Sequence, residues 1–275
     1  MSSNIFSLTR PSYSLPETLS AAIEAFLQKE KATAQHIADC VLRMSDFYID
    51  QPLAPTPWQE RWCQIAQVAY FLPLNYLRAQ AVWDECQKQI KKNNFELSRK
   101  GLIDFGSGLG AASLPVLLAQ ALDPQVLQSQ NTSDEIKTDL AFSSFASKDI
   151  TFVERSGIAN QMFLNILQAT LTEKNLNLEK NFHTPDKIHS ITDDKTILCS
   201  FSLTEHEHLP DWLLQAHSVI LIEPATREDG RNLLKTREQL IEQGFHIAAP
   251  CTHQQACPLL NKSEHDWCHD RIHIK

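Results

Sequence analysis

Glycine is scarce in this chain, yet four of its seven glycines lie in one decapeptide, GLIDFGSGLG, at Gly101, Gly106, Gly108 and Gly110. Glycine permits positive φ angles and lets a ligand approach the main chain where a Cβ would obstruct it. An apolar run ending in Asp104–Phe105 precedes this loop and a helical pattern follows it. The free N–H groups at the start of a helix favour electron-rich ligand groups. The decapeptide therefore predicts a cofactor-binding loop.

The spacing of the glycines narrows the kind of cofactor. Dinucleotide sites prefer G-x-G-x-x-G, and a P-loop needs G-x-x-x-x-G-K-[ST], whereas this loop reads D-x-G-x-G-x-G. The next apolar run ends at Glu154, whose carboxylate could accept hydrogen bonds from a ribose diol. A polar segment, residues 122–148, lies between the loop and this run and is interpreted as an inserted loop. Together these features favour a ligand with a ribose and no pyrophosphate.

A second group of reactive residues lies near the end of the chain. Three of the seven cysteines, Cys251, Cys257 and Cys268, follow a C-x5-C-x10-C spacing, and four histidines lie among them. Closely spaced cysteines without a secretory signal suggest a metal or an iron–sulfur cluster. Three thiolates and a histidine would satisfy tetrahedral zinc, whereas a cubane cluster normally has four cysteine ligands. The spacing by itself does not choose between the two.

Three regions would have to position these residues. Residues 1–95 show helical periodicity, contain no glycine and are expected to form a helical module in which Cys40, Cys63 and Cys86 are buried. Residues 96–250 alternate apolar runs with helical segments, which predicts an α/β domain with a parallel sheet covered by helices. The expected strands are residues 102–105, 149–154, 195–203, 218–224 and 245–250. Residues 251–275 form the Cys/His-rich tail.

Composition excludes several classes of protein. A formal net charge of −8 argues against a surface that coats nucleic acid throughout, although local basic patches such as Lys91–Lys92 with Arg99–Lys100 stay possible. No apolar stretch approaches the roughly 20 residues of a membrane span. The N-terminus lacks the charged and apolar regions of a secretory signal, so we expect a cytoplasmic, bacterial protein, with a mitochondrial location as the alternative.

Several motifs together resemble one family. DFGSGLG resembles motif I of class I S-adenosylmethionine methyltransferases. The chain from about Tyr70 to His269 is similar to the methyltransferase-like small-ribosomal-subunit assembly proteins of bacteria and mitochondria. The resemblance rests on the elements YFLPLNY at 70–76, Glu223–Pro224–Ala225–Thr226, Arg237 with Leu240, Ala249–Pro258, and Trp267–Cys268–His269. Alanine at 225 stands where that family usually has glycine.

The resemblance implies a class I methyltransferase (Rossmann-like) fold and association with the small ribosomal subunit or its rRNA. It further implies that Asp104, Gly106, Gly108 and Gly110 line the methionine part of S-adenosylmethionine and that Glu154 holds its ribose. It also implies that Cys251, Cys257 and Cys268 are ligands of a 4Fe-4S cluster, with zinc as the alternative. Family members carry a fourth cysteine downstream; here either a scattered cysteine or a histidine such as His269 would serve, or the sequence is a shortened form.

Catalytic residues are not identified by the sequence. Amino-methyltransferases carry a short motif such as N-P-P-Y after the fourth strand, and here that place reads CSFSLTEHEHLP, from Cys199 to Pro210. Glu205 and His206 are candidate pocket residues, although a solvated loop explains them as well. Two hypotheses therefore stand: an S-adenosylmethionine-dependent methyltransferase acting on ribosomal RNA, and an assembly factor that keeps the fold without catalysis.

Overall fold

A five-stranded parallel sheet lies at the centre of the protein. The computed structural model describes residues 11–93, 95–121, 145, 149–171, 178–203, 208–251 and 253–275. The strands, in the order β4-β3-β2-β5-β6, are β4 (Phe182–His183), β3 (Ile150–Val153), β2 (Leu102–Phe105), β5 (Thr196–Ser200) and β6 (Ser218–Ile222). All neighbouring pairs are parallel, and Asp104 of β2 lies opposite Phe152 of β3 and Leu198 of β5. The expected α/β fold with a Rossmann-like parallel sheet is confirmed.

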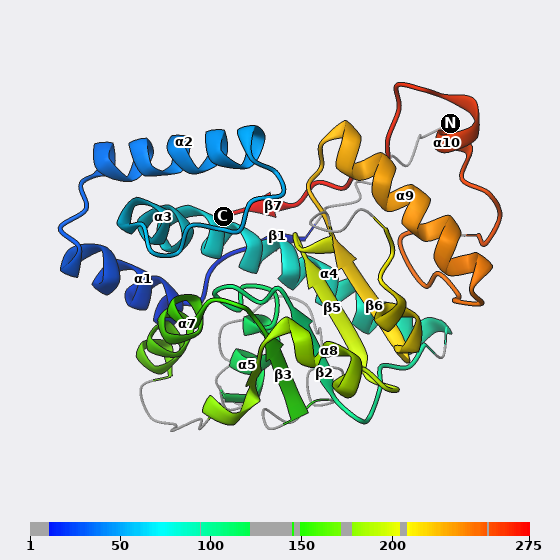
Figure 1. The fold of residues 1–275 in the computed structure, drawn as a ribbon, viewed down its shortest axis with the longest axis horizontal. Coiled ribbons are helices and arrows are strands. Elements are labelled where there is room, and N and C mark those ends of the chain that lie inside the picture. The colour runs from blue at the N-terminus through cyan, green and yellow to red at the C-terminus, as the bar shows by residue number, and fades with distance from the viewer. Residues whose placement is uncertain are drawn as a thin grey trace, which may run out of the picture.

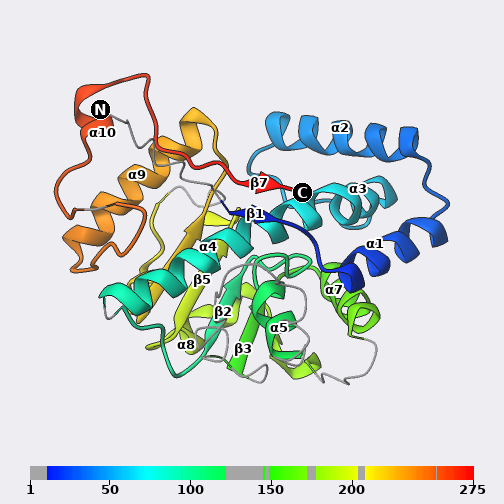
Figure 2. The same cartoon turned by 180° about the vertical axis from the view of Figure 1, so that it is seen from behind.

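Successive side chains of a strand point to opposite faces, so each strand contributes to two cores. On one face Leu102, Phe152 and Leu198 pack with α1 (Glu17–Lys29), α4 (Leu72–Asn93), α5 (Leu114–Ala121) and α7 (Gly157–Thr170). On the other face Ile103 and Ile197 pack with α8 (Ile188–Ile191), the 3-10 helix η7 (Asp211–Gln215) and α9 (Arg227–Glu242). Figure 2 shows α4 running across the first face.

The residues before the sheet are helical, as expected. Beyond α1 and α4 they form α2 (Ala34–Asp50), α3 (Arg61–Ala66) and the π-helix η1 (Gln67–Phe71). Cys40 and Cys63 are buried there, and Cys86 is half-buried. Leu19 and Trp83 belong to the same hydrophobic cluster as Leu102 and Phe163. Helices α1 and α4 therefore share one core with the sheet, whereas the buried residues of α2 and α3 form a separate cluster.

The tail runs from α9 back to the N-terminal helices. After the short helix α10 (Pro258–Lys262) the chain ends in β7 (His273–Ile274), which pairs in parallel with β1 (Ser12–Tyr13). Figure 1 shows this red segment passing from α10 to the region between α2 and the sheet. Short elements η4 (Glu179–Asn181) and η5 (Pro185–Lys187) flank β4.

The prediction of a strand at residues 245–250 was wrong. This segment is irregular, and the described sheet ends at β6 on one side and, on the other, at β4, a strand that the sequence did not reveal. The reason is a side chain that takes the place of a partner strand. Ile247 N–H donates to Gln254 Oε1 at 2.8 Å, and Gln254 Nε2 donates to the Ile247 carbonyl at 2.8 Å. The main-chain groups of Ile247 are thus satisfied locally.

The glycine loop joins β2 to α5, and two of its glycines contact neighbouring side chains where a Cβ would lie. A Cβ on Gly106 would lie 2.5 Å from Ser202 Cβ, and one on Gly110 would lie 2.4 Å from the Phe163 ring. Gly106, Gly108 and Gly110 all have positive φ angles, of 68°, 51° and 67°. Both the backbone conformation and the packing therefore require glycine at 106 and 110.

We expect Gly110→Ala to destabilise the protein by about 1–3 kcal/mol, because the added methyl group overlaps a buried ring and the φ angle is positive. Gly157→Ala is the matched control. Gly157 is the first residue of α7 and no heavy atom lies within 4 Å of its Cβ position. That substitution is expected to leave stability unchanged or raise it by about 0.5–1 kcal/mol. Urea unfolding measures both, and equal stability of the two variants would contradict the packing argument.

Candidate functional site

The glycine loop lies where the order in which the chain adds strands to the sheet reverses. β3 and β4 lie on one side of β2 and β5 and β6 on the other, so the chain reverses between β2 and β5. In open α/β sheets, ligands bind at such a switch point, beyond the carboxyl ends of the strands. Gly106 N–H and Ser107 N–H both donate to the Val153 carbonyl at the end of β3, at 2.8 and 3.2 Å. The loop is thereby tied to the carboxyl edge of the sheet.

The structure brings the predicted cofactor residues together. Glu154, at the end of β3, is buried, and its Oε2 accepts a hydrogen bond from Gly108 N–H at 3.1 Å. Its Oε1 accepts from Ser156 N–H at 2.8 Å. Residues 46 positions apart in the chain thus meet. The carboxylate that the resemblance assigns to a ribose is, in this structure, bound to the glycine loop itself.

Asp104 lies beneath the loop, inside the protein. Its side chain is 1% exposed, and Oδ2 accepts a hydrogen bond from Ser113 Oγ at 2.6 Å. Burial raises the pKa of Asp104 to about 7; the Glu154 charge adds to the rise, and the Ser113 hydrogen bond opposes it. With so little exposed surface and this partner, Asp104 supports the loop from within.

Two polar atoms near the loop have no partner in the described structure. Ser107 Oγ and Asn160 Oδ1 are buried, and neither makes a hydrogen bond. Ser107 lies within the loop, and Asn160 lies on α7, one turn before the Phe163 ring that packs on Gly110. Buried polar atoms are nearly always hydrogen-bonded, so an unpaired pair beside a predicted cofactor loop indicates a missing partner.

The helical module contributes two tryptophans that the sequence did not point to. The Trp58 ring lies 3.6 Å from the Cβ position of Gly108, and its side chain is 6% exposed. Trp83 of α4 donates from Nε1 to the Ala112 carbonyl at 2.8 Å, just beyond the loop. Both contacts join residues far apart in sequence, and no local spacing signals them.

The other motif residues have structural partners. Tyr76 is buried in the core, Asn75 accepts from Arg78 at 3.0 Å, and Tyr70 is exposed. Tyr70 lines a hollow of about 450 Å³ between the start of α4 and β7, on a different part of the surface from the glycine loop. Glu223 Oε1 accepts from Leu203 N–H at 3.1 Å, after the fourth strand of the sheet. Glu205 and His206 lie outside the described residues.

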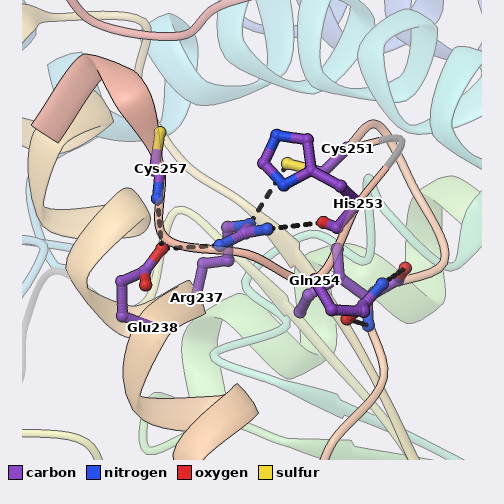
Figure 3. A network of polar contacts seen from close by, with 7 residues as sticks. Arg237, Glu238, Cys251, His253, Gln254 and Cys257 are labelled. Atoms are coloured by element: carbon purple, nitrogen blue, oxygen red, sulfur yellow. Dashed lines mark hydrogen bonds and ion pairs between the residues drawn. The ribbon is translucent and has the colours of Figure 1, made fainter.

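The cysteine tail is anchored to α9 by two arginines. The Arg237 side chain is buried, and its Nε donates to Cys251 Sγ at 3.2 Å and its Nη2 to the His253 carbonyl at 2.7 Å. Glu238 Oε1 accepts both from Arg237 and from Cys257 N–H, the latter at 3.1 Å. Figure 3 shows Arg237 between these partners. Arg231 donates to three tail carbonyls, those of Leu259, Ser263 and Asp266.

The thiols of Cys251, Cys257 and Cys268 interact electrostatically, but among the described residues they do not form a metal-binding group. Burial raises the pKa of the Cys268 thiol, and the charges of Cys251 and Cys257 raise it further. Within the described ranges, however, no group of three His, Cys, Asp or Glu side chains is arranged to hold a metal ion. The described residues therefore do not support the predicted iron–sulfur cluster or zinc site.

Comparison with known families identifies the chain. The model of the Rsm22 family, described as mitochondrial small ribosomal subunit Rsm22, matches residues 64–275. The chain belongs to this family. The matched range contains the glycine loop, Glu154, the Glu223–Thr226 element and the whole tail, so the suspected family is confirmed. A search of curated proteins found no match. Among the described helices none is long and apolar enough to cross a membrane.

The buried Asp104 predicts a pH dependence of stability. Its ordinary pKa is 3.8, so between about pH 4 and pH 7 the folded carboxyl keeps a proton that the unfolded chain has lost. The free energy of unfolding should therefore fall as pH rises through this window, by at most about 1.4 kcal/mol per pH unit, and level off above it.

Asp104→Asn removes the titration while keeping an acceptor for Ser113, so its stability relative to wild type should increase from pH 4 to pH 7. Ser113→Ala is the companion variant, because losing the hydrogen bond that favours the charged form should extend the window to higher pH. Urea unfolding across the pH range measures both. Parallel pH profiles for wild type and Asp104→Asn would contradict the prediction.

Proposed function

We propose that this Rsm22-family chain binds S-adenosylmethionine at the glycine loop and acts with the small ribosomal subunit or its rRNA. The observation that carries the proposal is the hydrogen bond between Gly108 N–H and Glu154 Oε2. It joins the predicted methionine end and the predicted ribose end of the site at one edge of the sheet. The family description supports the ribosomal half of the proposal, since it names the small ribosomal subunit.

The residues around the loop fit such a ligand. Among the described residues Ser107 Oγ and Asn160 Oδ1 lack partners, which a polar ligand would supply, and the Trp58 ring lies at contact distance, 3.6 Å, from the Cβ position of Gly108. Glu154 would exchange the Gly108 N–H for the hydroxyl groups of a ribose. When bound, S-adenosylmethionine would supply an electrophilic methyl group; the residues described would hold and orient it.

We expect isothermal titration with S-adenosylmethionine to detect binding and Ser107→Ala to weaken it several-fold. One hydrogen bond contributes about 0.5–1.5 kcal/mol, and Ser107 Oγ has no protein partner to lose, so the fold should be unaffected. Ser113→Ala is the control for stability. It removes a hydrogen bond to Asp104 and should lower the free energy of unfolding, which Ser107→Ala should not. No heat of binding to the folded wild-type protein would contradict the proposed cofactor.

A second candidate, an assembly factor without catalysis, is favoured by how closely the site is filled. Ser202, directly after the fourth strand, packs on Gly106 and donates to the Phe105 carbonyl at 2.8 Å. Trp58 covers Gly108 from the helical module. Neither side chain is a general base. Transfer of labelled methyl from S-adenosylmethionine to small-subunit RNA separates the candidates, because only the enzyme methylates.

The metal-binding part of the proposal concerns the tail. We infer that Cys251, Cys257 and Cys268 are its ligands, for an iron–sulfur cluster or, as the alternative, zinc. The donor set supports this, because the charges of Cys251 and Cys257 raise the pKa of the Cys268 thiol and Arg237 Nε donates to the Cys251 sulfur. A bound metal would require these side chains to draw closer than they lie here.

Metal analysis of protein purified without oxygen tests this inference. We expect iron or zinc in wild type and its loss in Cys257→Ser. Cys40→Ser, in the separate cluster of α2 and α3, should retain the metal. Wild-type protein free of both metals would contradict the assignment.

The expected cytoplasmic, bacterial location stays a prediction, since the family description names the mitochondrial subunit.

A further inference from the structure

Exposed apolar side chains gather on one helix of the N-terminal module. The described residues contain seven large hydrophobic side chains that are exposed, and four of them lie on α2 or in the turn after it. These four are Leu42, Tyr48, Ile49 and Leu53. α2 is the outermost helix of the module, and α3 lies between it and the sheet in both views (Figures 1 and 2).

The helical period places two of them on a single stripe of α2. Leu42 and Ile49 are seven residues apart, about two turns, so they share a face, and Leu53 lies in the turn that follows the helix. They are 64%, 76% and 64% exposed. The buried residues of α2, Cys40 and Met44, occupy the opposite face. The stripe therefore points away from the module's own core.

Negative charge borders this stripe. Asp39, Asp46 and Asp50 are exposed and follow the same helical repeat along one side of it. The one Lys or Arg in α2 is Arg43, and its guanidinium lies over the Trp62 ring, 4.1 Å from the centroid. Arg43 keeps its charge in this contact and lies within one turn of Asp39 and Asp46, so this surface of α2 carries three carboxylates against one guanidinium. We call Leu42, Ile49, Leu53, Asp39, Asp46 and Asp50 the acidic–apolar face.

Charge complementarity indicates which kind of partner can bind the acidic–apolar face. Phosphates of RNA and anionic lipid headgroups would be repelled by three carboxylates. A second copy of this chain would bring like charges together. A helical protein segment with apolar residues at spacings of three and four, flanked by Lys or Arg, satisfies both the stripe and its acidic border.

We propose that the acidic–apolar face of α2 is a docking site for a basic, amphipathic segment of a partner protein. This surface is separate from the glycine loop. It assigns the helical module a protein-binding role that is independent of S-adenosylmethionine.

The probe for this proposal is a fluorescein-labelled helical peptide of about 18 residues, or five turns, built from Leu and Lys with apolar spacings of three and four. A peptide with Glu in place of every Lys is its charge-reversed counterpart. Fluorescence anisotropy measures binding to the full chain. We expect the Leu/Lys peptide to bind, with an affinity that falls as salt rises, and the Leu/Glu peptide not to bind.

Matched variants separate the apolar and charged contributions. The double substitution Leu42→Ser/Ile49→Ser should weaken binding by about tenfold or more, because it removes two apolar contacts. Asp46→Asn/Asp50→Asn should weaken binding several-fold and reduce its salt dependence. Ile158→Ser, which alters an exposed apolar residue on α7, should retain full affinity. All these positions are solvent-exposed, and circular dichroism verifies that the variants fold.

Several outcomes would overturn the proposal. One is equal binding of the two peptides; another is unchanged affinity in Leu42→Ser/Ile49→Ser. Competition by a small-subunit RNA fragment would assign the face to nucleic acid instead. Self-association that the double substitution abolishes would assign it to a second copy. S-Adenosylmethionine titration of the same double variant should match wild type, so failure of the proposed cofactor site and failure of this docking site are distinguishable.

Discussion

Side chains from other elements pack so closely on the glycine loop between β2 and α5 that only glycine fits at two of its positions. Ser202 after β5 packs on Gly106, Phe163 of α7 packs on Gly110, and Trp58 of the helical module faces Gly108. Glu154 after β3 closes the arrangement with its hydrogen bond to Gly108 N–H. The loop thus contacts the ends of β3 and β5, helix α7 and the N-terminal module. A change in its main chain would disturb the packing of all four.

Those features of the fold that rest on local patterns were predictable from the sequence. The strands at 102–105 and 218–222 and the glycine loop carry their own signals, because apolar runs and glycine act on adjacent residues. β4 has only two residues, too few for a periodicity. The segment at 245–250 has the composition of a strand, but the side-chain amide of Gln254 forms hydrogen bonds with the N–H and carbonyl of Ile247 in place of a neighbouring strand. Competition from a nearby side-chain amide is invisible to a hydrophobic pattern.

The candidate site divides in the same way. Glu154 and the loop residues were found because each ends or follows an apolar run. Trp58, Trp83 and Ser202 were not, because each reaches the loop through a tertiary contact with no fixed sequence spacing. For the tail, the cysteines were evident from sequence. The residues that support them were only partly evident, since Arg237 stood out in the family pattern without a role and no motif pointed to Arg231.

The packing also changes what the glycine pattern means. Gly106 and Gly110 are required by Ser202 and Phe163, whether or not a ligand is present, so two of the three glycines are explained by the fold itself. Gly108 differs, because its nearest neighbour lies at an ordinary contact distance of 3.6 Å and its N–H is held by a carboxylate that a ligand could replace. Ser107 adds a buried hydroxyl that has no partner among the described residues. The argument for a cofactor therefore rests on Ser107, Gly108 and Glu154, and the flanking glycines build the loop that presents them.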